Sequence, residues 1–269
     1  DRHVAPSGWN YTTIQAAVNA SVDGDRIIVH NGTYNENVLI LNKTLTVMPY
    51  LTDKPIVDGG SGHCFNVTSN EYDDITIIDL NMTNTGTYAV CINGVADVNV
   101  TGNIIDLLNP SSSNYGIFLS NTGFYIYGDV EICDNAIKKH YMTWGSGVRA
   151  NNVMGSLKIN KNIITLIGGP STGIEASVDY GDIQVNENVI SALVSGSYGI
   201  NLGDLYGDCQ ANENTIESYN EFRVQWTAGE MEAIGNTINS TDSYGIYLNS
   251  VDGKTYANEN TIDSDSEGI

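Results

Sequence analysis

The strongest constraint on the fold is an internal repeat that extends over most of the chain. A small residue followed by alternating apolar positions recurs in each copy, for example in Gly173-Ile174-Glu175-Ala176 and Gly199-Ile200-Asn201-Leu202. The first apolar residue of each copy recurs every 22 to 31 residues, at positions 65, 90, 117, 148, 174, 200, 222, 246 and 269. A period of this length is typical of a stacked architecture in which no single copy folds alone.

A second marker follows the same period. An Asn two residues before an apolar residue recurs in step with the first series, at Asn103, Asn135, Asn162, Asn188, Asn214, Asn236 and Asn260. Asn tolerates the left-handed backbone region, so we expect these residues at a corner of each repeat. Identical Asn side chains in successive copies can also hydrogen-bond to one another as a ladder.

The short runs within each copy alternate with period two, as in Ile183-x-Val185, and turn residues separate them. This pattern is typical of β-strands, and a helical 3.6-residue period is missing. We therefore predict an all-β fold, a right-handed single-stranded parallel β-helix whose adjacent coils pair about 4.8 Å apart. Equivalent residues then stack, and one interior column is expected to hold Ile117, Val148, Ile174 and Ile200.

A solenoid needs caps, because its end coils expose core and strand edges. Thr12 and Gln15 have capping-box spacing, and Ile14, Ala17 and Val18 form one apolar stripe, which predicts a short N-terminal capping α-helix over residues 12–20. Strands are expected next at 27–29, 38–40 and 45–47.

The C-terminal end has no comparable cap, because the chain stops at Gly268-Ile269, the beginning of another copy. We expect residues 1–269 to be a single β-helix domain and a fragment of a longer protein. Further domains of the same chain, or a copy of itself, would cover the open end.

Charge narrows the range of partners. The chain has 32 acidic and 11 basic residues and a net charge of -21, which opposes binding to nucleic acid or anionic lipid. Its apolar runs, such as Val38–Leu41, are much shorter than the roughly 18 to 20 residues of a membrane helix. We therefore expect no nucleic-acid partner and no membrane insertion in this segment.

Other features predict a secreted glycoprotein at the cell surface. The sequence starts at Asp1 without Met or a hydrophobic leader, as after removal of a signal peptide or excision from a precursor. Eight Asn-x-Ser/Thr sites are candidates for glycosylation: Asn10, Asn19, Asn31, Asn42, Asn66, Asn81, Asn99 and Asn239. The four cysteines lack metal-binding spacing and are expected to be free thiols.

The opening of the chain resembles a known family. Thr13-Ile-Gln-Ala-Ala-Val18, Asp23-Gly-Asp-Arg-Ile-Ile-Val29, Gly32-Thr-Tyr34 and Glu36-Asn-Val38 are similar to the start of pectin-lyase-like β-helices in archaeal, especially methanogen, cell-surface proteins. The later Tyr-Gly-Ile and Asn-Glu-Asn-Thr-Ile copies resemble NosD-like repeats, also called carbohydrate-binding and sugar-hydrolysis repeats. The resemblance implies the fold, while its members range from adhesin-like envelope proteins to polysaccharide lyases, hydrolases and a copper-enzyme maturation factor.

Catalysis would need specific groups. A lyase for acidic polysaccharides needs a cation and a base, and the Arg-x-Pro-x-x-Arg and Trp-x-Asp-His signatures of pectate lyases are missing. Five of the eleven basic residues nevertheless fall in one 24-residue window, at Lys138, Lys139, Arg149, Lys158 and Lys161. The candidate catalytic residues are Lys139, His140, Arg149 and Glu175. Arg149 points outward below Glu175 of the next coil, so the two form either a cross-strand ion pair or part of a site.

Metal sites are weakly indicated. Four scattered His and five scattered Met supply no copper cluster. Carboxylate pairs for a glycosidase are too numerous in so acidic a chain to single one out. Ca²⁺ is the one cofactor suggested, because Asp263, Asp265 and Glu267 have the spacing that opens a calcium loop, although the distal acidic ligand is absent.

Tyrosines offer the clearest binding feature. Tyr88, Tyr115, Tyr198 and Tyr244 each precede the small residue of a copy and are expected to share one outward face. Such rings either stack on sugars in a groove or pack across coils as β-favouring residues.

Two functions follow as expectations. The first is an extracellular cell-envelope or adhesin-like module with a structural or carbohydrate-binding role, no catalysis, and a polysaccharide or cell-envelope glycan as its partner. The alternative is a polysaccharide lyase or glycoside hydrolase acting on an extracellular polysaccharide, with its site at the insertion after Ile137.

Overall fold

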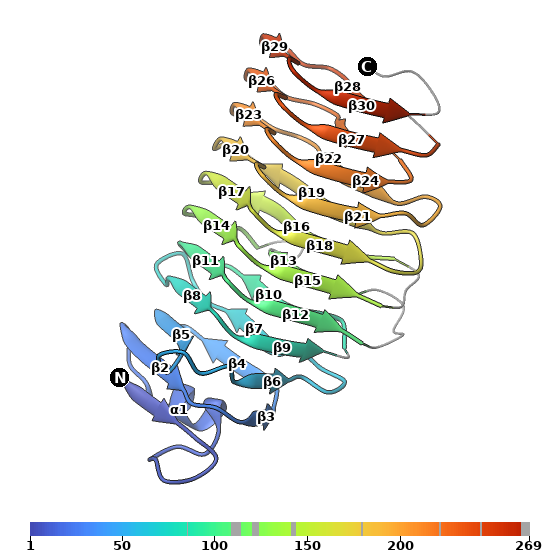
Figure 1. Ribbon diagram of the computed structural model, residues 1–269. Coiled ribbons are helices and arrows are strands. Elements are labelled where there is room, and N and C mark those ends of the chain that lie inside the picture. The colour runs from blue at the N-terminus through green and yellow to red at the C-terminus, as the bar shows by residue number, and fades with distance from the viewer. Residues whose placement is uncertain are drawn as a thin grey trace.

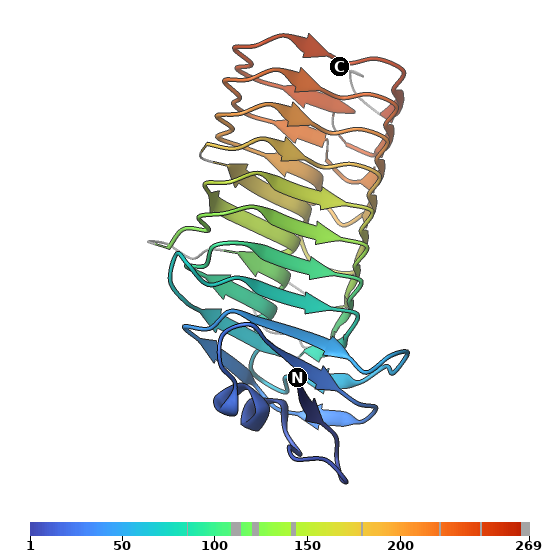
Figure 2. The same ribbon diagram turned by 90° about the vertical axis from the view of Figure 1, so that its left-hand side faces the viewer.

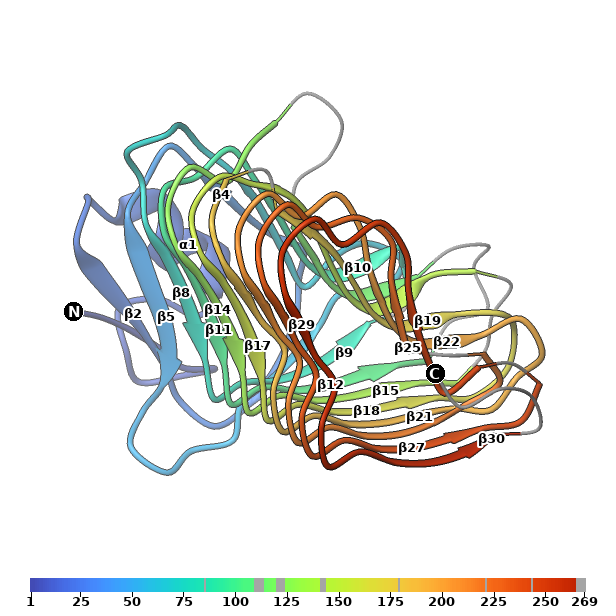
Figure 3. The same ribbon diagram turned by 90° about the horizontal axis from the view of Figure 1, so that it is seen from above.

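The chain winds as stacked coils about one long axis (Figure 1). The computed structural model describes residues 1–84, 86–108, 114–119, 124–140, 144–178, 180–220, 222–242 and 244–264. Seen along the axis, three parallel sheets, which we call A, B and C, enclose the interior (Figure 3). The chain passes from A to B to C and so winds as a right-handed coil. The predicted right-handed parallel β-helix is therefore confirmed.

The sheets contain eleven, ten and nine strands in the described part of the chain. Sheet A consists of β1 Arg2–Val4, β2 Asp25–Val29, β5 Leu45–Pro49, β8 Ile75–Ile78, β11 Val98–Thr101, β14 Val130–Cys133, β17 Leu157–Asn160, β20 Ile183–Gln184, β23 Cys209–Gln210, β26 Met231–Glu232 and β29 Thr255–Tyr256. Sheet B consists of β3 Thr33–Asn35, β6 Ile56–Asp58, β9 Asn81–Asn84, β12 Ile104–Leu107, β15 Ala136–Lys139, β18 Ile163–Leu166, β21 Val189–Ala192, β24 Thr215–Ser218, β27 Thr237–Ser240 and β30 Thr261–Ser264. Sheet C consists of β4 Val38–Leu41, β7 Phe65–Thr68, β10 Tyr88–Asn93, β13 Tyr115–Leu119, β16 Ser146–Val153, β19 Thr172–Val178, β22 Tyr198–Leu202, β25 Phe222–Val224 and β28 Ile246–Leu248.

Interior columns of apolar side chains hold the coils together. Strand pairing places Ile117 beside Val148, Val148 beside Ile174, and Ile174 beside Ile200. All four side chains are fully buried. Because successive residues of a strand face opposite sides, every second residue of sheet C points outward and is available to build a surface.

An asparagine ladder runs along the corner between sheets A and B. Each Oδ1 accepts from the backbone N–H and from the side-chain amide of the Asn one coil earlier, at 2.9–3.1 Å, over the six steps from Asn103 to Asn260. Each Nδ2 also donates to a main-chain carbonyl, as Asn162 does to Ile132 at 2.8 Å. The predicted ladder is confirmed.

The expected backbone role of these Asn residues was wrong. The left-handed residue is the one just before each Asn, for example Lys161 with φ 58° and Glu187 with φ 57°. That residue makes the turn and points to solvent. The following Asn turns inward, where its side chain bonds main-chain groups at the corner that have no partner in a neighbouring strand.

The N-terminal coil is covered by one short helix, α1 Ile14–Ala20 (Figure 2). Its Ile14, Ala17 and Val18 are buried against the first coil, as predicted. The helix begins two residues later than expected: Thr13 is the N-cap, and its Oγ1 accepts from the N–H of Ala16 at 3.1 Å. Gln15 is not part of a capping box with Thr12. Its side-chain amide instead bonds both main-chain groups of Leu39 and so blocks the free edge of β4.

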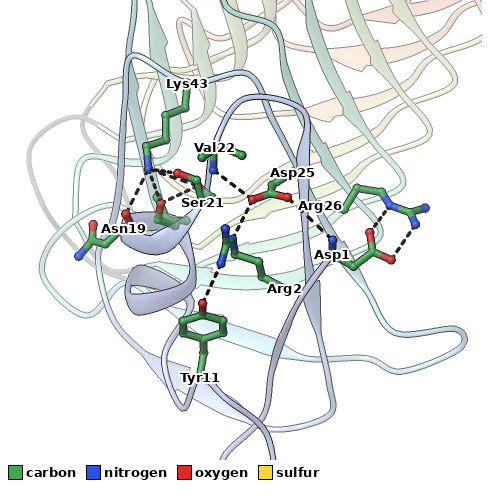
Figure 4. Close-up of polar contacts among 10 residues, drawn as sticks. Asp1, Arg2, Tyr11, Asn19, Ser21, Val22, Asp25, Arg26 and Lys43 are labelled. Carbon is green, nitrogen blue, oxygen red and sulfur yellow. Dashed lines mark hydrogen bonds and ion pairs between the residues drawn. The ribbon is translucent and has the colours of Figure 1, made fainter.

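Basic side chains secure this cap (Figure 4). Lys43 Nζ donates to the carbonyls of Val18 and Ser21 at 2.7 Å and so satisfies the C-terminal end of α1. Arg2 joins β1 to Asp25 of β2 at 2.8 Å. Cationic groups at this end are therefore engaged in structure.

Two histidines meet on the outer side of the cap. His3 Nδ1 and His30 Nε2 lie 3.0 Å apart, and Trp9 stacks on both rings, with centroids at 4.4 and 4.7 Å. Tyr50 stacks on His30 at 4.4 Å, and Asp53 Oδ2 lies 3.7 Å from His30 Nδ1. Burial lowers the pKa of His30, and the neighbouring His3 lowers it further. A hydrogen bond between two imidazole nitrogens needs one protonated nitrogen as donor and one bare nitrogen as acceptor. Protonation of the acceptor nitrogen therefore breaks the contact.

Acidification should loosen the first strand. A His whose pKa is lower in the folded than in the unfolded chain loses its stabilising contribution as the pH falls through its folded pKa. We expect hydrogen exchange of the β1 amides, corrected for the intrinsic rate, to be faster at pH 5 than at pH 7. His3→Phe keeps a ring against Trp9 and removes the second charge, so it should reduce the difference. Equal protection of β1 at both pH values would contradict this expectation.

Several smaller expectations also meet the structure. The four cysteines are buried, and none of them forms a disulfide with another. No helix within the described ranges is both long and apolar enough to cross a membrane. The predicted start of another copy at Gly268-Ile269 lies outside the described residues.

Candidate functional site

A groove of about 750 Å³ lies on the outer face of sheet C. We call it the sheet C groove. Strands β10, β13, β16, β19 and β22, with residues that follow β13, β22 and β25, supply its lining: Tyr88, Tyr115, Phe118, Tyr125, Arg149, Asn151, Asn152, Glu175, Ala176, Ser177, Asn201, Gly203, Asp204 and Gln225.

The polar floor follows from the strand register. Phe118 pairs with Arg149, Arg149 with Glu175, and Glu175 with Asn201 on successive strands, all at the same outward position. The next outward residue of β16 is Asn151, two positions on. Four neighbouring coils therefore present one aromatic, two charged and one amide side chain in a row along the axis.

Arg149 and Glu175 hold each other in this row. Arg149 Nη2 lies 3.5 Å from Glu175 Oε1, and Glu175 Oε2 accepts from Ser146 Oγ at 3.0 Å. Arg149 Nη1 donates to the Tyr115 hydroxyl at 3.3 Å, and the Asn151 carbonyl oxygen accepts from Arg149 Nε at 2.9 Å. Both charged side chains remain about 30% exposed, at 32% and 29%. The predicted cross-strand contact is confirmed. It holds two charged side chains in place at the surface, and both can still form hydrogen bonds to a ligand.

Aromatic rings form the wall nearest the N-terminal end of the groove. Tyr88 and Tyr115 stack with centroids 5.3 Å apart and planes at 19°, and Phe118 contacts both rings. The guanidinium of Arg149 lies 5.8 Å from the centroids of Tyr115 and Phe118, within cation–π range. Burial is the main cause of the raised pKa of the Tyr88 phenol.

The four predicted tyrosines do not form one continuous row. Tyr88 and Tyr115 are neighbours, but Ser146 and Thr172 occupy the same position on the next two coils before Tyr198. Asn220 then separates Tyr198 from Tyr244, which contacts Tyr247 instead. The three copies without Tyr at this position interrupt the stack, and neither Tyr198 nor Tyr244 belongs to the groove lining.

The other catalytic candidates lie on sheet B. Lys139 is fully buried at an interior position of β15, where the flanking coils place Leu107 and Leu166. His140 Nε2 lies 2.8 Å from Asp106 Oδ1 on the outer side of the same sheet. The structure thus brings Arg149 and Glu175 together and places Lys139 and His140 outside the groove lining.

Lys139 is chemically unusual. Its Nζ donates to Ser171 Oγ at 3.0 Å and to the Trp144 carbonyl at 3.2 Å, and no carboxylate of the described residues pairs with it. Burial lowers the pKa of Lys139 to about 7. The amine is therefore held by neutral acceptors, which favour it little in its charged form.

Metal binding finds no geometric support within the described residues, where no group of three His, Cys, Asp or Glu side chains is placed to hold an ion. Of the predicted calcium residues, Asp263 lies on β30, while Asp265 and Glu267 fall outside the described residues. The eight sequon Asn residues are all exposed or half-buried.

Sequence reasoning missed part of the groove. Asn151, Asp204 and Gln225 line it together with Arg149. Asn151 could have been predicted, because it lies two residues after Arg149 on the same strand and therefore faces outward as Arg149 does. Asp204 and Gln225 lie in or beside turns whose path the period does not specify.

A scan against models of known protein families found no family that matches the chain, and a search of the curated proteins found no matching protein.

Proposed function

We propose that the chain is an extracellular glycan-binding module of the cell surface that binds its ligand in the sheet C groove and performs no catalysis. The observation that carries this proposal is the fixed row of Arg149, Glu175 and Asn201 beside the stacked rings of Tyr88 and Tyr115. Sugar recognition requires both features, because a pyranose has apolar C–H faces and a rim of hydroxyl groups.

The polar groups suit hydroxyl recognition. Asn151, Asn201 and Gln225 offer amide donors and acceptors, and the Arg149–Glu175 pair offers N–H donors beside carboxylate acceptors. Paired side chains lose little conformational entropy when a ligand binds, because they are already fixed. Parallel coils underneath make the row rigid, since each strand is hydrogen-bonded on both sides.

Surface features support the proposed location. The accessible sequon Asn residues permit N-glycosylation, and the acidic composition suits a solvated exterior role. The proposal includes kinship with the pectin-lyase-like and NosD-like β-helices of archaeal cell-surface proteins. It also includes an end-to-end contact of the solenoid with further domains of the same chain or with a second copy.

The groove can be tested by removing Arg149. Arg149→Ala should weaken binding of a glycan selected on a glycan array by about tenfold or more, or about 1.4 kcal/mol, because it removes two anchored donors and releases Glu175. Isothermal titration calorimetry gives the affinity. Arg26→Ala is the matched control, since Arg26 pairs with Asp1 in the cap and should leave binding unchanged.

Two results would contradict the proposal. The first is an array on which the folded protein binds no glycan. The second is release of reducing or unsaturated products from any bound polysaccharide, which would favour the lyase or hydrolase alternative; Lys139→Ala, His140→Ala and Arg149→Ala combined would then test the residues suggested for it.

A further inference from the structure

Exposed aromatic rings gather along one corner of the solenoid. Six of the eleven exposed aromatic side chains of the described residues lie in the turns that lead from sheet C to sheet A, and they are between 41% and 79% exposed. We call them the corner aromatic row: Tyr72, Phe124, Tyr125, Tyr127, Tyr180 and Tyr206. Exposed rings at one corner of several coils are unusual, because β-solenoid turns are normally polar and aromatic area exposed to water is unfavourable.

The rings are arranged along the solenoid axis. Tyr180 and Tyr206 belong to successive coils and stack with centroids 6.2 Å apart and planes at 24°. Trp226 of the following coil meets Tyr206 edge-on at 4.8 Å. Tyr125 and Tyr127 form a second pair, also at 6.2 Å, two coils before Tyr180. The distance between coils, about 4.8 Å, is comparable to the length of one pyranose unit in an extended glycan.

The row borders the sheet C groove. Tyr125 itself lines the groove, and so do Asp204 and Gln225, which lie within two residues of Tyr206 and Trp226. A chain-like ligand in the groove that extends along the axis would therefore meet these rings on its side facing sheet A.

Charge indicates which kind of glycan fits. The groove lining contains one cation, Arg149, and two carboxylates, Glu175 and Asp204, and Arg149 already contacts Glu175. A uronate or sulfate would meet a carboxylate excess in a chain of net charge -21. Uncharged hydroxyl groups meet amide and carboxylate partners instead.

Arg223 does not change this balance. It follows Asn201 in the same outward register, but its guanidinium donates to the Gln225 carbonyl oxygen and lies 5.4 Å from the Tyr247 centroid. It is held by an amide and a ring, outside the groove lining.

We propose that the corner aromatic row is a sugar-stacking platform that extends the sheet C groove, and that the ligand is a neutral glycan chain lying along the solenoid axis. The platform rests on the proposed function, because it adds subsites to the same ligand. Longer glycan chains bind more tightly because they reach Tyr180 and Tyr206 and stack on them, whereas the groove supplies the hydrogen bonds.

The test begins with a glycan array that holds neutral hexose, N-acetylhexosamine, uronate and sulfated oligosaccharides, each from two to eight units. Wild-type protein should bind a neutral series, with affinity rising with length and nearly independent of salt. The double variant Tyr180→Ala, Tyr206→Ala should bind the longest member at least tenfold more weakly and the disaccharide unchanged. Tyr256→Ala is the matched control, because this exposed Tyr lies on β29 away from the row.

The outcomes separate the two proposals. If long glycans bind, Arg149→Ala weakens them and the double variant does not, the platform is refuted and the groove stands. Preference for uronate or sulfated series, or affinity that falls steeply with salt, refutes the neutral ligand. If no glycan binds, both proposals fail. Tryptophan fluorescence supplies an independent signal, because Trp226 contacts Tyr206: it should shift on binding in the wild type and less in Trp226→Phe, which keeps the other two tryptophans. Unchanged thermal unfolding of the variants shows that they remain folded.

Discussion

Replacing Asn162 by Ala should lower the free energy of unfolding by about 3 kcal/mol or more. Asn162 is fully buried in the middle of the ladder. Its Oδ1 accepts from the backbone N–H and the side-chain amide of Asn135, both at 3.0 Å, and its Nδ2 donates to the Ile132 carbonyl at 2.8 Å. Ala leaves these groups buried without a partner, and each costs about 1 to 3 kcal/mol.

Denaturant unfolding followed by far-UV circular dichroism measures this effect. Asn258→Ala is the matched control, because this Asn is exposed and lies outside the ladder, so its unfolding midpoint should remain close to that of the wild type. Asn162→Asp keeps the acceptor and loses the amide donor to Ile132. At pH 7 its free energy of unfolding should lie between those of Asn162→Ala and Asn258→Ala if the Asp is neutral, and below that of Asn162→Ala if the Asp stays charged. A loss below about 1 kcal/mol in Asn162→Ala would show that the ladder is not a principal source of stability.

Replacing Lys139 by Leu should have the opposite sign. The amine occupies a column whose neighbours are Leu107 and Leu166, and burial holds the pKa of Lys139 at about 7 against 10.5 for a free lysine. Leu fits the column and needs no hydration, while the lost bonds to Trp144 and Ser171 oppose the gain. We expect a net rise in the free energy of unfolding on the order of 2 kcal/mol at pH 7.

The pH dependence identifies the cause. Between about pH 7 and 10.5 the unfolded chain binds the lysine proton and the folded chain does not, so the stability of the wild type rises with pH in this window, by up to about 1.4 kcal/mol per unit. Lys139→Leu removes this contribution. Comparing the two proteins from pH 7 to 9 cancels the other titrating groups, and the stability difference should shrink as pH rises. A difference independent of pH would mean that Lys139 is charged in the folded chain.

Much of the fold was predictable because the repeat encodes it directly. A two-residue alternation decides which side chains face inward, so the column of Ile117, Val148 and Ile174 could be aligned from residue numbers alone. The same alternation placed Arg149 and Glu175 outward on neighbouring coils. Stacking then brings equivalent residues together whatever their chemistry, which is why the Asn ladder was also foreseen.

Interruptions of the repeat were not predictable in the same way. The tyrosine column is one example: Ser146 and Thr172 interrupt it, and whether rings on separate coils contact one another depends on how the intervening side chains pack. Lys139 was predicted as a candidate catalytic residue at an insertion after Ile137. Its sequence neighbours Lys138 and His140 suggested a polar loop, whereas β15 continues through it and turns its side chain inward.

The sequence by itself determined the coil, its apolar interior column and its corner ladder, because these depend on periodic patterns that successive copies repeat. Tertiary structure alone decided the groove and the corner aromatic row. Their members come from strands and turns with different offsets in each copy, and a turn directs its side chains according to the packing of the coils above and below it rather than according to a local pattern. Residues as far apart in sequence as Tyr88 and Gln225 therefore line one cavity only once the coils are stacked.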